Sequence, residues 1–215
     1  SSSTYTAKDI TYDGFGRPSY DLVIQGEVVN RIALGVTGEH NVYNSLAAIA
    51  VAMELGAGFD AVMAGLKKFT GTDRRFEKKG EIGGVTIIDD YAHHPQEIKA
   101  TLSAAKNYPH RKLWCVFQPH TYTRTKAFLD QFAQTLSAAD EVILADIYAA
   151  RETDTLGVSS LDIVERIERL GTKAHYIPSF DDIETFILEN CINGDVLITM
   201  GAGDIVKVGE KLLGR

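Results

Sequence analysis

The second half of the chain alternates short apolar runs with helical patterns, and this alternation constrains the fold more than any other feature. The apolar runs are continuous, as expected of strands that helices cover on both faces of a parallel sheet. Between them, apolar residues recur at the spacing of one helix face, as in Phe128, Phe132 and Leu136. The expected strands are residues 85–89, 113–117, 142–146, 174–177 and 196–199. We therefore predict an α/β domain with a mostly parallel sheet.

The beginning of the chain follows another pattern. Two helical patterns reach residue 68, and a small polar stretch at 70–75 after them is the candidate domain junction. Before the helices, β-branched and aromatic runs separated by turns predict strands at 4–12, 19–25 and 27–34. A first part with mixed strands and helices is therefore expected.

Composition and charge exclude several classes of function. The 215 residues include 22 basic and 29 acidic side chains, and the net charge is −7. Such an acidic chain disfavours a nucleic-acid surface. The longest apolar run, residues 46–53, is far shorter than the ~20 residues that span a bilayer, and no secretory leader opens the chain. The two cysteines make neither a disulfide scaffold nor a zinc site, so we expect a protein of the reducing cytoplasm. From its charge and its short apolar runs we expect no nucleic-acid or membrane partner.

Polar or glycine-rich loops follow four of the expected strands. In open parallel sheets ligands bind beyond the carboxyl ends of the strands, so these loops are expected to converge. Each loop alone also has a purely structural interpretation, with Asp89 and Asp90 as a solvated strand end and Gly201 and Gly203 in a tight turn. The loops are residues 90–95, 118–124, 148–152 and 200–204.

Two histidines and an arginine in these loops are candidates for chemistry. His93 stands at an expected helix start, where it could bind or handle a proton, although adjacent histidines are more often surface residues. Its spacing matches no metal motif, so no metal site is predicted. His120 and Arg124 are four residues apart, and Arg124 could clamp a carboxylate, the alternative being a surface charge.

Two further groups lie nearer the beginning of the chain. Arg74 and Arg75 form a basic pair at the candidate junction, where they either contact a ligand or belong to a solvated linker. Asn41 and Asn44 open a helical pattern, where they could cap the helix or pair with an adenine edge.

Several blocks of sequence resemble the Mur ligase family, the ATP-dependent amide-forming ligases of peptidoglycan precursor synthesis. The blocks are residues 38–48, 73–77 and 89–95, in the family's order. Three later blocks narrow the resemblance to the member that joins L-alanine to UDP-N-acetylmuramate, namely 118–125, 147–152 and 200–204. Two alternatives stay open: the family member that recycles murein tripeptide, and a stand-alone module that binds a nucleotide or amino acid.

The resemblance implies an architecture. Residues 1–72 would be the C-terminal part of a central ATP-binding domain, an α+β remnant. Residues 73–215 would be the C-terminal domain, with a Rossmann-like, mostly parallel sheet and helices on both faces. The sequence contains no G-x-x-x-x-G-K-[ST] phosphate cradle. ATP and Mg²⁺ are the implied cofactors, with the Mg²⁺ ligands mostly outside this chain, which is expected to be inactive by itself.

The resemblance also implies which residues bind ATP. Asn41 and Asn44 would contact adenine, and Arg75 would reach the phosphates. Asp90 would hold the ribose hydroxyls, with Tyr91 beside the base.

A second set of residues would bind L-alanine. His93, His120 and Arg124 would line its pocket, with Arg124 on the carboxylate. His93 and Arg75 are the expected catalytic residues. In the implied reaction the amine attacks an acyl phosphate, and the group that accepts the amine proton stays open.

Overall fold

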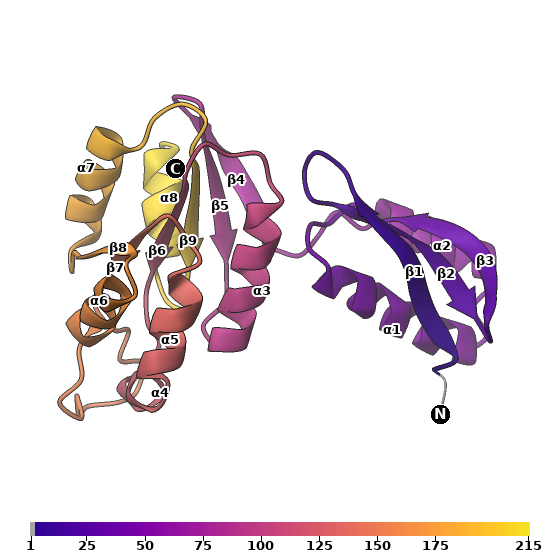
Figure 1. The fold of residues 1–215 in the computed structure, drawn as a ribbon, viewed down its shortest axis with the longest axis horizontal. Coiled ribbons are helices and arrows are strands. Elements are labelled where there is room, and N and C mark those ends of the chain that lie inside the picture. Colours follow the sequence, from indigo (N-terminus) through magenta and orange to yellow (C-terminus); the bar gives the residue numbers. More distant parts are fainter. Residues whose placement is uncertain (1–2) are drawn as a thin grey trace. The chain divides into compact units, whose positions relative to one another are not determined.

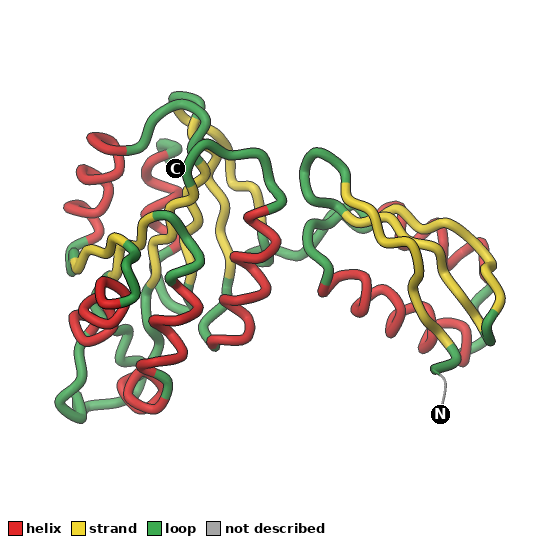
Figure 2. Tube along the Cα trace, viewed as in Figure 1, coloured by secondary structure: helices red, strands yellow, loops and turns green. Residues whose placement is uncertain are grey.

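The computed structural model describes residues 3–215, which form two compact units (Figure 1). The first holds the chain up to Thr72 together with Asn107–Pro109, and the second holds Asp73–Lys106 and His110–Arg215. Each unit has its own sheet, and Figure 2 marks its strands, helices and loops.

The first unit is a small α+β structure. Tyr20 and Leu22 of its central strand are fully buried with Val42 and Ile49 of its first helix. Inside this core a hydrogen bond of 2.7 Å joins Tyr20 Oη to Ser45 Oγ and ties the sheet to the helix. The antiparallel sheet has the order β1 (Tyr5–Tyr12), β2 (Pro18–Ile24), β3 (Glu27–Ala33), and the helices are α1 (His40–Glu54) and α2 (Phe59–Lys68).

The second unit is built on a six-stranded sheet with the order β4-β5-β9-β6-β7-β8. β4 pairs antiparallel with β5, and all other neighbours are parallel. The chain therefore moves outward from β5 to β8 and returns to insert β9 between β5 and β6. The strands are β4 (Glu77–Ile82), β5 (Val85–Asp90), β6 (Leu113–Phe117), β7 (Glu141–Leu144), β8 (Lys173–Tyr176) and β9 (Val196–Met200).

Helices cover both faces of this sheet. Right-handed crossovers place the outward and the returning connections on opposite faces. Alternate residues of a strand point to opposite faces of the sheet and so pack against different helix layers. On one face, Ile87 and Leu197 share a core cluster with Ile183 and Val208. The predicted Rossmann-like fold class is confirmed. One layer contains α3 (Pro95–Lys106), α5 (Leu129–Leu136) and α6 (Ser160–Arg169), and the other contains α7 (Phe180–Asn190) and α8 (Val206–Leu212).

Two elements differ from the sequence-based expectation. β4 was not expected, because Glu77–Ile82 is mostly charged and lacks an apolar alternation; charged residues are common on such edge strands. The single helix expected through Phe128 is divided into α4 (Tyr122–Ala127) and α5. Phe128 separates them with φ −121° and ψ 21°, outside the helical region.

Candidate functional site

The predicted loops meet at the carboxyl edge of the six-stranded sheet. β5, β9, β6 and β7 are parallel neighbours, so their carboxyl ends lie side by side. Beyond the strands, His120 and Tyr148 form an isolated parallel bridge. Tyr148 N donates to the Pro119 carbonyl, and Thr121 N donates to the Tyr148 carbonyl, both at 2.8 Å. The loops after β6 and β7 are therefore tied together.

His93, His120 and Arg124, predicted from two different loops, come together at this edge. The ring centroids of His93 and His120 are 6.0 Å apart, and Arg124 Nη1 lies 3.5 Å from Nδ1 of His120. His120 stacks on Tyr148 at 5.5 Å between ring centroids, and His93 meets Tyr91 edge-on at the same distance. A cation beside two imidazoles suits a small ligand that carries a carboxylate and an amine.

The surroundings of His120 favour a neutral ring. Burial lowers the pKa of its imidazole, and the positive charges of Arg124 and His93 lower that pKa further, against an opposing effect of Glu152. Arginine only donates hydrogen bonds, so the contact with Arg124 requires an unprotonated Nδ1. The ring proton of the neutral His120 is therefore on Nε2.

Nδ1 of His93 lies 3.0 Å from the carbonyl oxygen of Tyr91, which can only accept, so Nδ1 carries a proton. The backbone around it is fixed by Glu97, whose Oε2 accepts from the N–H groups of His93 and His94 at 3.0 and 3.2 Å. Glu97 and the Tyr91 carbonyl therefore fix both the backbone and the ring of His93.

Backbone strain also collects at this edge. Thr121 and Ala150 have φ of 68° and 54°, and Arg74 and Phe76 have φ of 57° and 48°. Such conformations cost on the order of 1–3 kcal/mol for non-glycine residues and cluster at functional sites. Glu152 helps to hold the Thr121 segment, because its carboxylate accepts hydrogen bonds from the backbone N and from Oγ1 of Thr123.

Asp89 and Asp90 are buried, which corrects their interpretation as a solvated strand end. Asp89 is fully buried and Asp90 is 5% exposed. Asp90 accepts from the backbone N–H of Ala92 at 2.7 Å and from that of Phe76 at 2.9 Å. Burial raises the pKa of both carboxyls, although the hydrogen bonds they accept oppose the rise. Asp90 therefore fixes the turn that presents Tyr91.

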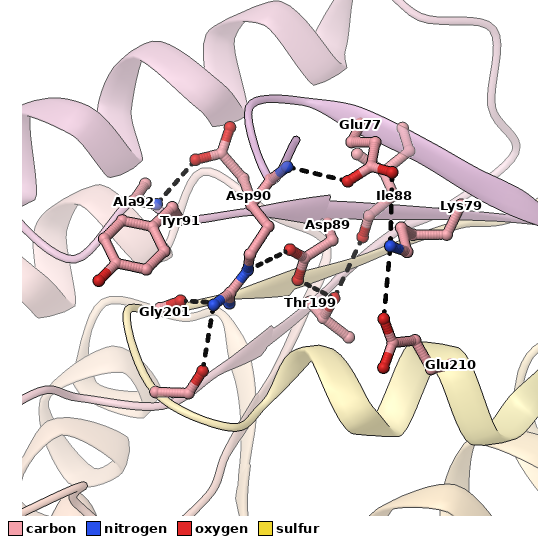
Figure 3. A network of polar contacts seen from close by, with 12 residues as sticks. Glu77, Lys79, Ile88, Asp89, Asp90, Tyr91, Ala92, Thr199, Gly201 and Glu210 are labelled. Carbon is pink, nitrogen blue, oxygen red and sulfur yellow. Dashed lines mark hydrogen bonds and ion pairs between the residues drawn. The ribbon is translucent and has the colours of Figure 1, made fainter. Parts of the chain in front are cut away.

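Arg74, which the sequence marked only as half of a basic pair, contacts Asp89 and the loop after β9. Figure 3 shows Asp89, Thr199 and Gly201 of this network. Its Nε donates to Asp89 Oδ2 at 2.8 Å. Its Nη2 donates to the Gly201 carbonyl at 2.8 Å and its Nη1 to the Gly203 carbonyl at 3.3 Å. The other Asp89 oxygen accepts from Thr199 Oγ1 at 2.7 Å, so the buried carboxylate is hydrogen-bonded on both sides.

Arg75 lies beside the same aromatic ring as Arg74. The two guanidinium carbons are 5.6 and 4.9 Å from the Tyr91 ring centroid, for Arg75 and Arg74 respectively. Within residues 3–215, Arg75 makes no hydrogen bond or ion pair, so its donors are available to a ligand.

The loop after β9 approaches the end of β6 closely. A Cβ on Gly201, which has φ 149°, would lie 2.7 Å from the carbonyl oxygen of Gln118. A Cβ on Gly203 would collide with the Gln118 side chain and lie 3.0 Å from the Tyr148 ring. Gln118 is 6% exposed, and its Oε1 has no hydrogen-bond partner in the described part of the chain. An unpaired buried acceptor costs ~1–3 kcal/mol.

Asn41 and Asn44 belong to the first unit. Both lie inside α1 rather than at its N-cap, which is Glu39. Asn44 Nδ2 donates to Asn41 Oδ1 at 3.0 Å, and Asn41 Nδ2 donates to the Thr37 carbonyl at 2.9 Å. The structure therefore pairs the two asparagines with each other.

Residues 3–215 show neither a metal cluster nor a membrane-spanning helix. No cluster of three or more His, Cys, Asp or Glu side chains there could hold a metal ion. Within the same range, no helix combines the length and the apolar character needed to cross a bilayer.

Known proteins resemble this chain along nearly all of its length. The UDP-N-acetylmuramate–L-alanine ligase of Lachnospira eligens is 62% identical over 211 residues, covering 98% of this chain and 46% of that protein. The crystal structure of UDP-N-acetylmuramate–alanine ligase from Thermotoga maritima matches with a TM-score of 0.83 and 29% identity, covering 99% of this chain and 45% of that one. A murein peptide ligase from Psychrobacter arcticus matches with a TM-score of 0.68 and 26% identity, covering 99% and 44%.

The chain thus spans about half the length of the curated relatives it matches. The family model described as Mur ligase, glutamate ligase domain, matches residues 74–203, which is more than half of the chain. The chain belongs to the Mur ligase family.

Proposed function

We propose that a full-length ligase containing this chain joins L-alanine to UDP-N-acetylmuramate in an ATP-dependent reaction. The observation that carries the proposal is the meeting of His93, His120 and Arg124 at one sheet edge. In Mur ligase chemistry the substrate carboxylate first attacks the terminal phosphoryl group of ATP, which forms an acyl phosphate and releases ADP. The free amine then attacks the carbonyl carbon, the bond to the phosphate oxygen breaks, and phosphate leaves with its electron pair while the amine loses a proton.

The proposed L-alanine pocket follows from the charges and tautomers of its residues. Arg124 binds the carboxylate with its guanidinium fork. The neutral His120 donates from Nε2, and an unprotonated Nε2 of His93 accepts a hydrogen bond from the amine or takes its proton. His93 and His120 are the two candidates on this chain for contact with the reacting nitrogen.

We assign ATP contacts to residues of each of the two units separately. On the second, Tyr91 stacks beside the base, Arg75 contacts the phosphates with its unused donors, and Asp90 holds the ribose hydroxyls through oxygen lone pairs left by its backbone bonds. On the first, the Asn41–Asn44 pair presents amide groups to adenine. Mg²⁺ offsets phosphoryl charge in such reactions, and we assign its ligands mostly to parts of the ligase outside this chain.

L-alanine is preferred here to the tripeptide of murein recycling for two reasons. The Thermotoga maritima alanine ligase matches with the higher TM-score, 0.83 against 0.68 for the murein peptide ligase. The run from His120 to Arg124 supplies the compact carboxylate pocket that a single amino acid needs. We place the reaction in the cytoplasm, where the free thiols of Cys115 and Cys191 fit a reducing environment.

Steady-state kinetics of Arg124→Ala in the full-length ligase test the proposal. Losing charge-assisted bonds to the carboxylate raises the KM for L-alanine by about tenfold or more, while the KM for ATP stays near that of the wild type. Lys126→Ala is the matched control, because Lys126 lies on the same helix and bonds only the exposed Leu156 carbonyl at 2.9 Å.

Three results would contradict the proposal in different ways. A full-length ligase that releases no phosphate in the presence of ATP, L-alanine and UDP-N-acetylmuramate lacks the proposed activity. Higher kcat/KM for the tripeptide than for L-alanine would identify the recycling ligase. Equal increases in both KM values would show that Arg124 does not hold the amino acid.

A further inference from the structure

The two arginines of the Arg74–Arg75 pair are used differently. Three nitrogens of the Arg74 guanidinium donate to Asp89, Gly201 and Gly203. Those of Arg75 donate to nothing among residues 3–215. Adjacent residues of the same type therefore have different parts in the site, one committed to the protein and one available to a ligand.

Arg74 joins segments that are far apart in the sequence. Asp89 lies in β5, whereas Gly201 and Gly203 follow β9, 127 and 129 residues beyond Arg74. The guanidinium also lies over the Tyr91 ring, and the Arg74 carbonyl accepts from Tyr91 N at 2.7 Å. A single side chain thus fixes the loop after β9 and the ring proposed to stack on the base.

A buried hydrogen-bond acceptor without a partner lies beside the loop after β9. Gly203 lies against the Gln118 carboxamide, whose Oε1 accepts no hydrogen bond in the described part of the chain. The two carbonyl bonds of Arg74 hold the loop in its observed arrangement.

We propose that Arg74 is a positioning residue for nucleotide binding: it holds the loop 201–203 and Tyr91 in place, whereas Arg75 contacts the nucleotide. The inference rests on the proposed ligase function, because one of its readouts is ATP affinity. Its main alternative is that Arg74 only neutralises the buried Asp89.

Two variants of the full-length ligase separate these possibilities. Arg74→Lys keeps the positive charge beside Asp89 but lacks the planar fork that reaches both glycine carbonyls. The double variant Arg74→Gln with Asp89→Asn removes both charges and leaves no buried carboxylate unpaired. Lys78→Arg, at an exposed position on β4, is the control.

We expect both variants to fold and to raise the KM for ATP by about tenfold, with the KM for L-alanine within about twofold of wild type. Wild-type ATP affinity in the double variant would show that Arg74 serves only to neutralise Asp89, and wild-type affinity in Arg74→Lys would show that the fork is not needed. Either result overturns the inference while leaving the ligase function intact.

Hydrogen exchange gives a readout that needs no catalysis. In both variants the amides of residues 201–205 should exchange faster, while those of β5 and β9 keep their wild-type protection. Unchanged exchange in residues 201–205 would overturn the inference even if the ligase proved to have another activity. Faster exchange in a ligase without the proposed activity would support the positioning role and refute the proposed substrates.

Discussion

His120 illustrates how the neighbours of one residue set its chemistry. Burial and the positive charges of Arg124 and His93 lower the pKa of its imidazole, and Glu152 opposes them. These effects favour an uncharged ring at neutral pH. A carboxylate ligand then meets the guanidinium of Arg124, and an amine meets an imidazole of His120 that does not repel it.

Single substitutions should move this pKa in opposite directions. Arg124→Ala removes a positive charge and raises the pKa of His120 toward its ordinary 6.5, whereas Glu152→Gln removes a negative charge and lowers it further. Titration of the ring carbon resonances by NMR measures both shifts, with Lys126→Ala as a variant that should cause none. Shifts of the same sign in Arg124→Ala and Glu152→Gln would contradict the arrangement of charges described here.

The sequence predicted which residues meet at the site better than it predicted their surroundings. His93, His120 and Arg124 follow two strands whose ends are both beside β9, so the topology brought them together as expected. The role of Arg74 could not be predicted. It depends on the complete burial of Asp89 and on carbonyl groups 127 and 129 residues away, and neither leaves a local pattern in the sequence.

Among the strands, β7 begins with a buried carboxylate, Glu141. This residue lies at the amino ends of the parallel strands, away from the candidate site at their carboxyl ends. Glu141 is 1% exposed and accepts hydrogen bonds from Lys112, from Lys173 and from His175 Nε2 at 2.6 Å. Burial alone would raise its pKa, but the hydrogen bonds from these three side chains lower it to about 2. The network joins β7 to β8 and to the residue before β6.

Glu141 should therefore stabilise the second unit in a defined pH range. Its pKa is about 2 in the folded state against 4.5 ordinarily, so the stabilisation is complete above pH 4.5 and is lost as the pH falls toward 2. Glu141→Gln should lower the free energy of unfolding by about 2–3 kcal/mol at pH 7, less than for a fully buried pair because its partners are partly exposed.

Urea unfolding at several pH values measures this effect. The difference between wild type and Glu141→Gln should shrink steadily below pH 4.5. Glu165→Gln is the control: its ion pair with Arg169 is exposed, and we expect a change below about 0.5 kcal/mol. A difference that stays constant down to pH 2 would show that the charge of Glu141 is not what stabilises the unit.

Elements with an apolar pattern were predictable, and those without one were not. β5, β6 and β9 are buried along their whole length or nearly so, and their positions agree with the sequence within a residue. β4 has no such pattern. It lies at the edge of the sheet, pairs with one strand only and carries mostly charged side chains. Nothing in the helical spacing of Phe128, Phe132 and Leu136 marks the break at Phe128.

At the scale of the whole molecule, the residues proposed to bind substrates can be separated from the motif that holds the transferred phosphoryl group. The chain carries the residues proposed for L-alanine and for several parts of ATP, but its sequence contains no G-x-x-x-x-G-K-[ST] motif. In P-loop enzymes that motif supplies the backbone cradle and the lysine that hold the transferred phosphoryl group. Affinity for an amino acid does not require it, whereas phosphoryl transfer does.

We therefore expect the 215-residue chain by itself to bind L-alanine without releasing phosphate from ATP. Adding L-alanine should shift the NMR signals of the His93 and His120 rings in a saturable way, and Arg124→Ala should abolish the shifts. D-Alanine is the matched ligand control, because it has the same charges with the opposite arrangement around Cα. Phosphate release by the chain alone would contradict the need for the missing cradle. If the ring shifts persist in Arg124→Ala, L-alanine does not bind in the proposed pocket at this edge of the sheet.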